Sequence, residues 1–544
     1  MKIDTTFPGK DYKCWLAKKK DTDPMGLPFS QDRTLEEFQL PPDWKEIFIK
    51  KLGELTKKYR SWQLYLDICV RCGACADKCH YFLGTEDPKN MPVARQELLR
   101  SVYRRYYTIG GRLFGSLVGA RELTKDVIKE FYSYYYECSM CRRCSYFCPY
   151  GIDTAEITSM ARELLTSIGI STKYITEVIA KLYVTGNNLG IPPKAFYRTI
   201  EVAEEEIKDE TGVDVKIPIN KKGVDVLFIP PSAEYFSPYH WGTMIGWAKM
   251  FHQIGLSYTV STYASEGGNF GLFFSYDDSK KVLKRISDEA KRVGAKLLIG
   301  GECGHQWRGW HQYFNTMHGE FDYLDTKSPT TGTDFGVPLV HICEFTADLI
   351  KHNKLKLDPS KNDKYNVVFA DSCNPARGMG LTEEPRYILK NVCNNYVEMK
   401  PEASKERCYC CGSGGGLLTE EIMDLRMKGA LPRAMAIKET GADYVALICA
   451  ICKAAHPPLL EHYGITAGVG GVHELVGNAI VLERESAPKP APVAAPAESE
   501  SGGDGGSECE LCGATFGTLD ECCDHAEKEH QIAKSACDMA CKEG

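Results

Sequence analysis

The 544-residue sequence predicts an α+β protein built from several domains, and three observations support this prediction. Two cysteine runs of the same spacing come first and lie among helical patterns. Two similar segments follow, in which buried-strand runs alternate with helical patterns, as in an α/β unit. Finally, a stretch rich in Ala, Pro, Ser and Gly separates a short segment with cysteines and histidines from the rest.

The composition is that of a globular protein, with 43% hydrophobic and 26% charged residues, and the length suggests roughly three to four domains of ~100–200 residues. A net charge of -7 gives no reason to expect nucleic-acid binding. No apolar run approaches the ~20 residues needed to cross a bilayer, and the first ten residues do not resemble a signal peptide. In a chain without an export signal, the 24 cysteines favour metal ligation over disulfides.

The two cysteine runs have the spacing of a ferredoxin with two clusters. They comprise Cys69, Cys72, Cys75 and Cys79, then Cys138, Cys141, Cys144 and Cys148 with Pro149 after it. In such a run the fourth cysteine ligates the other cluster. We therefore expect one [4Fe-4S] cubane on Cys69, Cys72, Cys75 and Cys148, and a second on Cys138, Cys141, Cys144 and Cys79. Both would be saturated with ligands and suited to electron transfer. Zinc sites close at four ligands with different spacing, which disfavours zinc here.

Two features depart from a compact ferredoxin. His80 stands where the first run usually carries proline, although no ligand is lost. The insertion between the runs includes the basic and aromatic residues 104–107 and a mixed apolar run, Ile109 to Ala120. Two interpretations of this insertion remain open: it docks a membrane partner or lies at a membrane surface, or it is a helical hairpin packed on the cluster domain.

The middle of the chain contains two similar segments. Residues 224–232 parallel residues 365–373, and residues 296–305 parallel residues 443–452. Each of these four segments contains the apolar run of a buried strand, and helical patterns such as 282–293 and 421–440 lie between the strands. We therefore expect an α/β unit with a largely parallel sheet, present twice.

The second of these segments carries five cysteines: Cys373, Cys410, Cys411, Cys449 and Cys452. A cubane needs only four cysteines. The adjacent pair can hardly occupy two corners of a cube, because successive Cβ atoms in an extended chain point to opposite sides. The pattern therefore favours an opened, distorted cluster that exposes iron to a substrate, with Cys410 and Cys411 as its catalytic ligands.

The first segment has lost nearly all of these thiols, and we expect it to complete the cavity. Cys303, His305, Trp307 and Arg308 follow a predicted strand end, where α/β sheets place their ligands. In one interpretation, His305 donates a proton to a departing thiolate, and Arg308 binds an anionic group of the substrate. The alternative is a structural histidine and a surface arginine.

The C-terminal segment has zinc-finger spacing. Residues 485–507 are predicted to be a flexible tether, and Cys509, Cys512, His525 and His530 would close a tetrahedron around Zn²⁺. The expected finger helix is acidic, which favours a protein-docking role over DNA reading. Cys522, Cys523, Cys537 and Cys541 leave other ligand sets open.

The five-cysteine pattern after a two-cluster ferredoxin segment resembles the CCG-domain proteins. These include the HdrD component of heterodisulfide reductase, the iron-sulfur subunits of glycolate oxidase and anaerobic glycerol-3-phosphate dehydrogenase, and DsrK. The degenerate first copy, with its residues 300–308, is most similar to the DsrK group of the membrane complex DsrMKJOP in dissimilatory sulfur metabolism. The resemblance implies that Cys373, Cys410, Cys411, Cys449 and Cys452 bind a noncubane [4Fe-4S] cluster.

The resemblance also implies a function. Electrons would pass from a membrane quinol and cytochrome b partner of the DsrM type, through two cubanes, to a noncubane cluster that reduces a di- or trisulfide on a DsrC-like small protein. The expected location is cytoplasmic, at the inner face of the cytoplasmic membrane. The alternative function is the iron-sulfur subunit of a flavin-linked 2-hydroxyacid or glycerol-3-phosphate dehydrogenase that feeds quinone.

Together these observations predict seven regions. They are an N-terminal extension (1–60), a helical two-[4Fe-4S] ferredoxin-type domain (61–170), a helical connector (171–221), a degenerate CCG domain (222–360), a CCG domain with the noncubane cluster (361–484), a linker (485–507) and a zinc-finger-like module (508–544).

Overall fold

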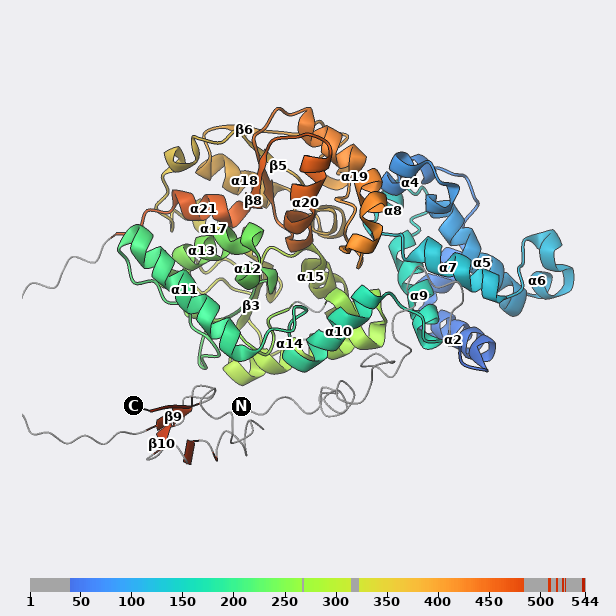
Figure 1. Ribbon diagram of the computed structural model, residues 1–544, viewed down its shortest axis with the longest axis horizontal. Coiled ribbons are helices and arrows are strands. Elements are labelled where there is room, and N and C mark those ends of the chain that lie inside the picture. Colours follow the sequence, from blue (N-terminus) through green and yellow to red (C-terminus); the bar gives the residue numbers. More distant parts are fainter. Residues whose placement is uncertain are drawn as a thin grey trace, which may run out of the picture.

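The computed structural model describes residues 40–266, 269–314 and 322–483, with short pieces at 507–509, 515–516, 521–522, 524 and 541–543. The described chain begins with a helical domain (Figure 1). Its helices are α2 (Trp44–Lys58), α3 (Arg60–Ile68), α4 (His80–Thr85), α5 (Pro92–Tyr107), α6 (Ile109–Phe114), α7 (Lys125–Tyr135), α8 (Arg143–Tyr146) and α9 (Thr154–Ser167). Short 3-10 turns η1 (Ala76–Lys78), η2 (Pro88–Asn90) and η3 (Gly115–Val118) connect them.

Local sequence explains where these helices begin. Thr124 accepts a hydrogen bond from the Val127 amide at the start of α7, and Asp153 does the same for the Ala155 amide at the start of α9. Proline occupies the first position of α5, where no backbone donor is lost. The predicted helical character of the cysteine-rich domain is therefore confirmed.

The helical domain starts earlier than the sequence suggests. Helix α2 belongs to the segment that we assigned to an N-terminal extension, but its Phe48 is fully buried and packs edge-to-face on Phe131 of α7. Residues 1–39 of that predicted extension lie outside the described residues.

Two helices, α10 (Lys173–Thr185) and α11 (Pro193–Thr211), lead into the first of two parallel sheets. This sheet has the order β2-β1-β3-β4, with β1 (Val226–Ile229), β2 (Tyr258–Thr259), β3 (Leu297–Gly300) and β4 (Leu339–His341). Around it lie α12 (Ala233–Phe236), α13 (Pro238–Gln253), η4 (Asn269–Phe273), α14 (Tyr276–Val293), α15 (Gly304–Gly309), the π-turn η5 (Trp310–Phe314) and α17 (Ile342–Lys351).

The second sheet repeats this order. It runs β6-β5-β7-β8, again all parallel, with β5 (Val367–Phe369), β6 (Tyr396–Val397), β7 (Tyr444–Leu447) and β8 (Gly468–Gly471). Its other elements are η6 (Pro359–Asn362), the π-turn η7 (Asn374–Gly378), α18 (Glu383–Val392), η8 (Lys405–Arg407), η9 (Glu420–Ile422), α19 (Met423–Lys438), α20 (Ala450–His462) and α21 (Val472–Ala479). The strands β1 and β3 match β5 and β7 in order, as the two sequence parallels predict.

A buried charged network joins the two sheets. Glu302 follows β3, Lys453 lies in α20, and their side chains meet at 2.8 Å with no exposed surface. His473 and Thr243 complete the network, with His473 Nδ1 at 2.8 Å from Glu302 and Lys453 donating to Thr243 at 2.7 Å. Burial alone would raise the pKa of Glu302, but Lys453 and His473 lower it to about 2. Since a buried charge needs a partner, this network fixes the ends of β3 and α20 beside each other.

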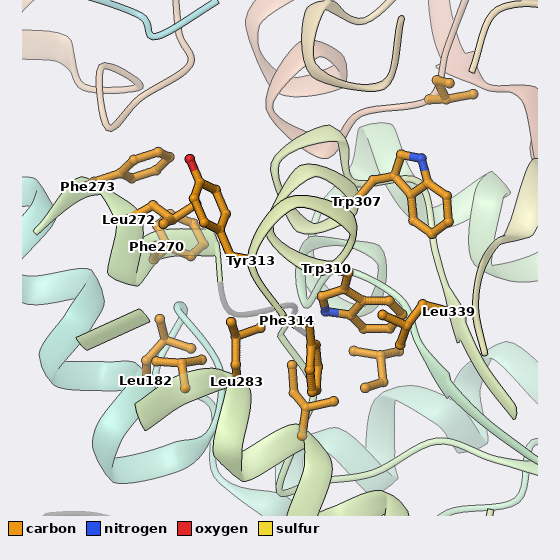
Figure 2. Packing of buried hydrophobic residues seen from close by; sticks show 14 of the residues in the cluster. Leu182, Phe270, Leu272, Phe273, Leu283, Trp307, Trp310, Tyr313, Phe314 and Leu339 are labelled. Carbon is orange, nitrogen blue, oxygen red and sulfur yellow. The ribbon is translucent and has the colours of Figure 1, made fainter. Parts of the chain in front are cut away.

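The segment after β3 is held by aromatic packing (Figure 2). Trp307 and Trp310 lie on one side of this turn near Leu339, while Tyr313 points toward the η4 residues Phe270 and Phe273. Trp310 has no exposed surface, and Trp307 is 2% exposed. Large rigid side chains on both sides of α15 therefore fix the direction in which His305 points.

The C-terminal pieces form a small antiparallel sheet of order β10-β9-β11, with β9 (Ser507–Cys509), β10 (Thr515–Phe516) and β11 (Cys541–Glu543). Of the four predicted zinc ligands, Cys512, His525 and His530 lie outside the described residues. Cys522 is disulfide-bonded, contrary to our expectation of reduced cysteines. The zinc-finger-like module stays a prediction.

Candidate metal centres

The first group of thiols surrounds a cavity at one end of the helical domain. The cavity is lined by Cys69, Cys72, Cys75 and Cys148, with Cys144 at its edge. Burial, with the nearby Cys148 and Cys69 sulfurs, raises the pKa of Cys75 to about 11. Cys148 comes from the second run, so this cavity brings together thiols of both runs. The crossed ligand sets of the two clusters stay a prediction.

The second group lies deeper in the same domain. Its cavity is lined by Cys79, Cys138, Cys141 and Cys144, and Cys79 is the contribution of the first run. Arg95 is 1% exposed and places Nη1 4.0 Å from the Cys79 sulfur, while the Asn90 carbonyl accepts from the same nitrogen at 2.8 Å. A buried guanidinium among thiols would balance the negative charge of thiolate ligands.

The third group comprises the five cysteines of the second α/β unit. Cys373 follows β5, Cys410 and Cys411 lie between β6 and α19, and Cys449 and Cys452 lie at the start of α20. Each is at most 6% exposed. Because the carboxyl ends of parallel strands share one edge of a sheet, residues far apart in sequence meet there. The Cys411 and Cys452 sulfurs lie 3.6 Å apart.

Hydrogen bonds polarise the thiols of this third group. Bonds from Cys141, Cys373 and Cys411 lower the pKa of Cys410 well below its usual range. A bond from Cys452, with another from His305, lowers the pKa of Cys449. Cys449 is also the N-cap of α20, where free amide groups favour a thiolate. Two of the five sulfurs are thus suited to carry negative charge.

The predicted residues of the first α/β unit separate into two sets. His305 reaches the third group: its Nε2 lies 3.1 Å from Asn374 Nδ2, which is 3.6 Å from the Cys373 sulfur. Cys303 also lies there as a neighbour of Cys449, and burial together with that neighbour raises its pKa. Trp307 packs in the core.

Arg308 does not reach the thiols. It is 2% exposed and forms an ion pair with Glu156 of α9 at 3.2 Å, and it also donates to Tyr313 at 3.2 Å. Its guanidinium therefore ties α15 to the helical domain and is not available to a substrate. The surface position considered in the alternative interpretation is also wrong, because this arginine is buried.

The second and third groups touch each other. His80 Nδ1 lies 2.7 Å from the Gly429 carbonyl, and its Nε2 lies 2.8 Å from the Ser139 hydroxyl. Ser139 Oγ is in turn 3.5 Å from the Cys410 sulfur. One ligand atom each of His80, Cys141 and Cys410 lie within 4.8 Å of one another. The histidine in place of the usual proline is therefore part of the junction between the cysteine runs and the five-thiol site.

Arg377 is a residue of this junction that the sequence analysis did not identify. Its Nε donates to the Cys141 carbonyl at 2.9 Å, and its Nη1 donates to the Cys408 carbonyl at 2.6 Å. The same Nη1 lies 3.3 Å from the Cys408 sulfur. Cys408 therefore pairs with an arginine beside the five-thiol site. In the sequence, the one indication of this role was that Arg377 lies four residues after the predicted ligand Cys373.

The donor sets fit iron-sulfur clusters. All thirteen cysteines of the three groups are free of disulfides, and they converge from separate elements on common sites. Crowded buried thiols with little carboxylate among them are the donor chemistry of soft metals and iron-sulfur clusters.

Among the described residues, we find no helix that combines the length and the apolar character needed to span a bilayer.

Comparisons with known proteins agree with this chemistry. Residues 65–152 match the family described as "4Fe-4S dicluster domain", and residues 367–455 match the family described as "Cysteine-rich domain", or CCG. The first match contains both cysteine runs, and the second contains all five cysteines of the third group. The described α/β unit that precedes residue 360 lies outside both matches.

Similar full-length proteins cover most of the chain. An Hdr-like menaquinol oxidoreductase iron-sulfur subunit 2 from Archaeoglobus fulgidus is 48% identical, over 86% of this chain and 89% of its own length. A corresponding subunit from Archaeoglobus profundus is 46% identical over the same shares. The HdrD component of the dihydromethanophenazine:CoB–CoM heterodisulfide reductase of Methanosarcina mazei is 27% identical, over 79% of this chain and 97% of its own. The chain therefore belongs to the family of Hdr-like menaquinol oxidoreductase iron-sulfur subunits, which is related to the HdrD component of heterodisulfide reductase.

Proposed function

We propose that this chain is the catalytic iron-sulfur subunit of a quinol-linked enzyme that reduces a di- or trisulfide carried by a small protein of the DsrC type. A membrane cytochrome b of the DsrM type would supply the electrons, and the chain would lie at the inner face of the cytoplasmic membrane. The observation that carries the proposal is the contact between Cys141 of the second thiol group and Cys410 of the third.

The three thiol groups have the order that such a path requires. Cys69, Cys72, Cys75 and Cys148 would hold one [4Fe-4S] cubane, and Cys79, Cys138, Cys141 and Cys144 would hold the other. The two cavities share Cys144 in their linings, and the second meets the five-thiol site through Cys141. A continuous series of sites therefore leads from the surface of the helical domain to the buried site.

Cys373, Cys410, Cys411, Cys449 and Cys452 would hold the noncubane [4Fe-4S] cluster, which supplies single-electron chemistry and an iron site for sulfur when bound. Cleavage of one S–S bond consumes two electrons and two protons, and it leaves two thiols from a disulfide or a thiol and a persulfide from a trisulfide. His305 would deliver a proton, because a hydrogen bond joins it to Cys449. The Asn374 amide nitrogen, 3.1 Å from His305 Nε2, would hold the ring in this orientation.

The burial of the five thiols limits which substrates can bring a sulfur atom to them. Each sulfur is at most 6% exposed, so a visiting sulfur atom reaches them only when their cover opens. His305 and the loop 413–416 form part of that cover, since a Cβ atom on Gly414 would lie 3.0 Å from His305 Cε1. A slender chain end that carries its sulfur near the tip suits such an entrance better than a folded surface does.

The test compares the wild-type protein with the Cys410→Ser/Cys411→Ser variant. We expect the variant to lose reduction of the di- or trisulfide, because serine does not replace thiolate as a soft-metal ligand. The paramagnetic resonance signals of the two cubanes should persist, since their eight cysteines are unchanged. A Cys343→Ser variant is the matched control, because Cys343 is also fully buried but lies at the start of α17.

Full reductase activity in the double variant would contradict the proposal. Loss of all resonance signals would show that the substitutions unfolded the protein, and a Cys411→Ser single variant would then decide between the two explanations.

A further inference from the structure

A short protrusion of the helical domain exposes an unusual amount of apolar surface. It consists of α6 and η3, residues 109–118, and it lies at the far end of the helical domain from the α/β units (Figure 1). Its exposed apolar residues are Ile109 (79% exposed), Leu113 (72%), Phe114 (57%), Leu117 (88%) and Val118 (39%). We call this segment the apolar tip.

The exposed apolar residues of the tip are clustered and not scattered singly over the surface. Fourteen large hydrophobic residues are exposed in the described chain, and five of them fall within these ten residues. Single exposed apolar residues need no explanation, but a contiguous group marks a surface that something else covers.

The base of the tip is well ordered. Thr108 caps α6 by accepting from the Gly111 amide at 3.1 Å, and Arg112 donates to the Tyr106 carbonyl at 2.9 Å. Arg104 donates to the Val118 carbonyl at 3.3 Å, which ties the end of the tip back to α5. The exposed side chains therefore stand on a defined support.

Cations in excess of their acidic partners surround this base. Arg71, Arg100 and Arg104 form ion pairs with Glu97 at 3.7, 3.5 and 2.9 Å, and Asp67 is a second carboxylate near Arg100 and Arg104.

Lys45 and Arg105 likewise share Glu122, at 2.5 and 2.8 Å. Arg112 is exposed on the tip and makes its described bonds to a carbonyl and not to a carboxylate. The chain as a whole carries a net charge of -7, so this cationic collar is a local feature.

We propose that the apolar tip inserts into the boundary between headgroups and acyl chains of an anionic lipid bilayer, with the cationic collar at the level of the headgroups. Apolar residues that enter the boundary and basic residues that meet anionic lipids are the two parts of interfacial membrane binding. Both parts are present here in adjacent residues.

The arrangement of the side chains favours lipid over a protein partner. Leu113 and Phe114 are neighbours in sequence, as are Leu117 and Val118, so their side chains point in different directions around the tip. A protein groove covers one face of a helix. Acyl chains cover a projecting tip from all sides.

Insertion would also orient the electron path. Arg100 belongs to the collar and donates from Nη1 to the carbonyl of Cys69, the first cysteine of the first run. The first thiol group would thus lie near the bilayer surface, while the five-thiol site faces away. The inference does not depend on which sulfur compound is reduced.

Vesicle flotation of the full chain tests this proposal. We expect the wild-type protein to float with vesicles of phosphatidylcholine and phosphatidylglycerol, and to bind more weakly to phosphatidylcholine alone. The Leu113→Glu/Leu117→Glu variant should bind the mixed vesicles at least about tenfold more weakly, because two charged side chains would have to enter the apolar boundary. The matched control is Val202→Glu, an exposed valine of α11 in a different part of the chain, which should bind as the wild type does.

Absence of wild-type binding to both kinds of vesicle would overturn the proposal, as would equal binding of the double variant. Equal binding to both vesicles would overturn the part assigned to the collar. The variant should keep its far-ultraviolet circular dichroism and its reduction of a di- or trisulfide by a soluble reductant. That second readout separates failure of the membrane proposal from failure of the proposed reductase function.

Discussion

His305 and Cys303 are side chains of the first α/β unit that lie beside the thiols of the second. The first unit lacks the cysteines for a cluster of its own, yet it places this histidine beside Asn374 and Cys449. The aromatic packing of Trp307 and Phe273 around α15 holds the ring in place, and Phe273 lies edge-to-face on it at 5.1 Å. Under the proposed function, this unit, which lacks the thiols for a cluster of its own, would supply the proton donor.

We predict that His305→Gln lowers the rate of S–S reduction by about 10²-fold or more, the size of a typical general acid contribution. Glutamine can keep a hydrogen bond to Asn374 but cannot transfer a proton. Steady-state turnover with a soluble reductant measures the effect, and the iron content should not change.

His311→Gln serves as the control for this variant. His311 lies six residues later, packs against Trp307 with the two rings tilted by 52°, and contacts the Leu339 carbonyl at 3.1 Å. Wild-type turnover in His305→Gln, or an equal loss in both variants, would show that His305 has no specific role.

The crossing of α4 and α19 sets the distance between the second and third thiol groups. Glycine lies on both sides of the contact: a Cβ atom on Gly84 would come 1.7 Å from the Lys428 carbonyl oxygen, and one on Gly429 would come 2.3 Å from the Tyr81 ring. A side chain at either glycine position would therefore collide with the facing helix. Because Cys79 immediately precedes α4 and the Cys410–Cys411 pair precedes α19, the close approach of the helices holds the two groups together.

We predict that Gly84→Ala separates the two helices and slows electron transfer to the five-thiol site. Overpacking of a tight contact costs about 1–3 kcal/mol of stability, and part of that strain would be relieved by moving α4 away from α19. Rapid mixing of the reduced protein with a di- or trisulfide measures how fast the cubane signals are reoxidised.

Gly110→Ala is the matched control, because Gly110 is also a helical glycine but has open space where its Cβ would lie. Reoxidation at the wild-type rate in Gly84→Ala would contradict the role given to the helix crossing.

At the scale of the whole molecule, the features that residue spacing and hydrophobic periodicity encode could be predicted. The crossed grouping of Cys148 with the first run follows from ligand spacing, and the repeated parallel sheet follows from alternating strand and helix patterns. Contacts between distant residues that belong to no spaced motif could not be predicted. Arg308 pairs with Glu156, and His80 contacts Gly429, because tertiary packing brings these residues together and no local pattern encodes it.

The same reason explains two features that the sequence analysis did not anticipate. Helix α2 joins the helical core through the contact of Phe48 with Phe131, and no residue spacing in the sequence predicts that contact. Arg377 became visible only when the sheets placed η7 beside Cys141. The five cysteines themselves were identified from sequence, since their types and intervals are sufficient to indicate a metal site.

The central claim is that the five thiols hold a third cluster in addition to two cubanes, and iron analysis tests it most directly. Three [4Fe-4S] clusters require about twelve iron atoms per chain, and two require about eight. We predict about twelve in the anaerobically purified wild-type protein and about eight in the Cys410→Ser/Cys411→Ser variant, measured together with acid-labile sulfide. About eight iron atoms in both proteins would contradict the account.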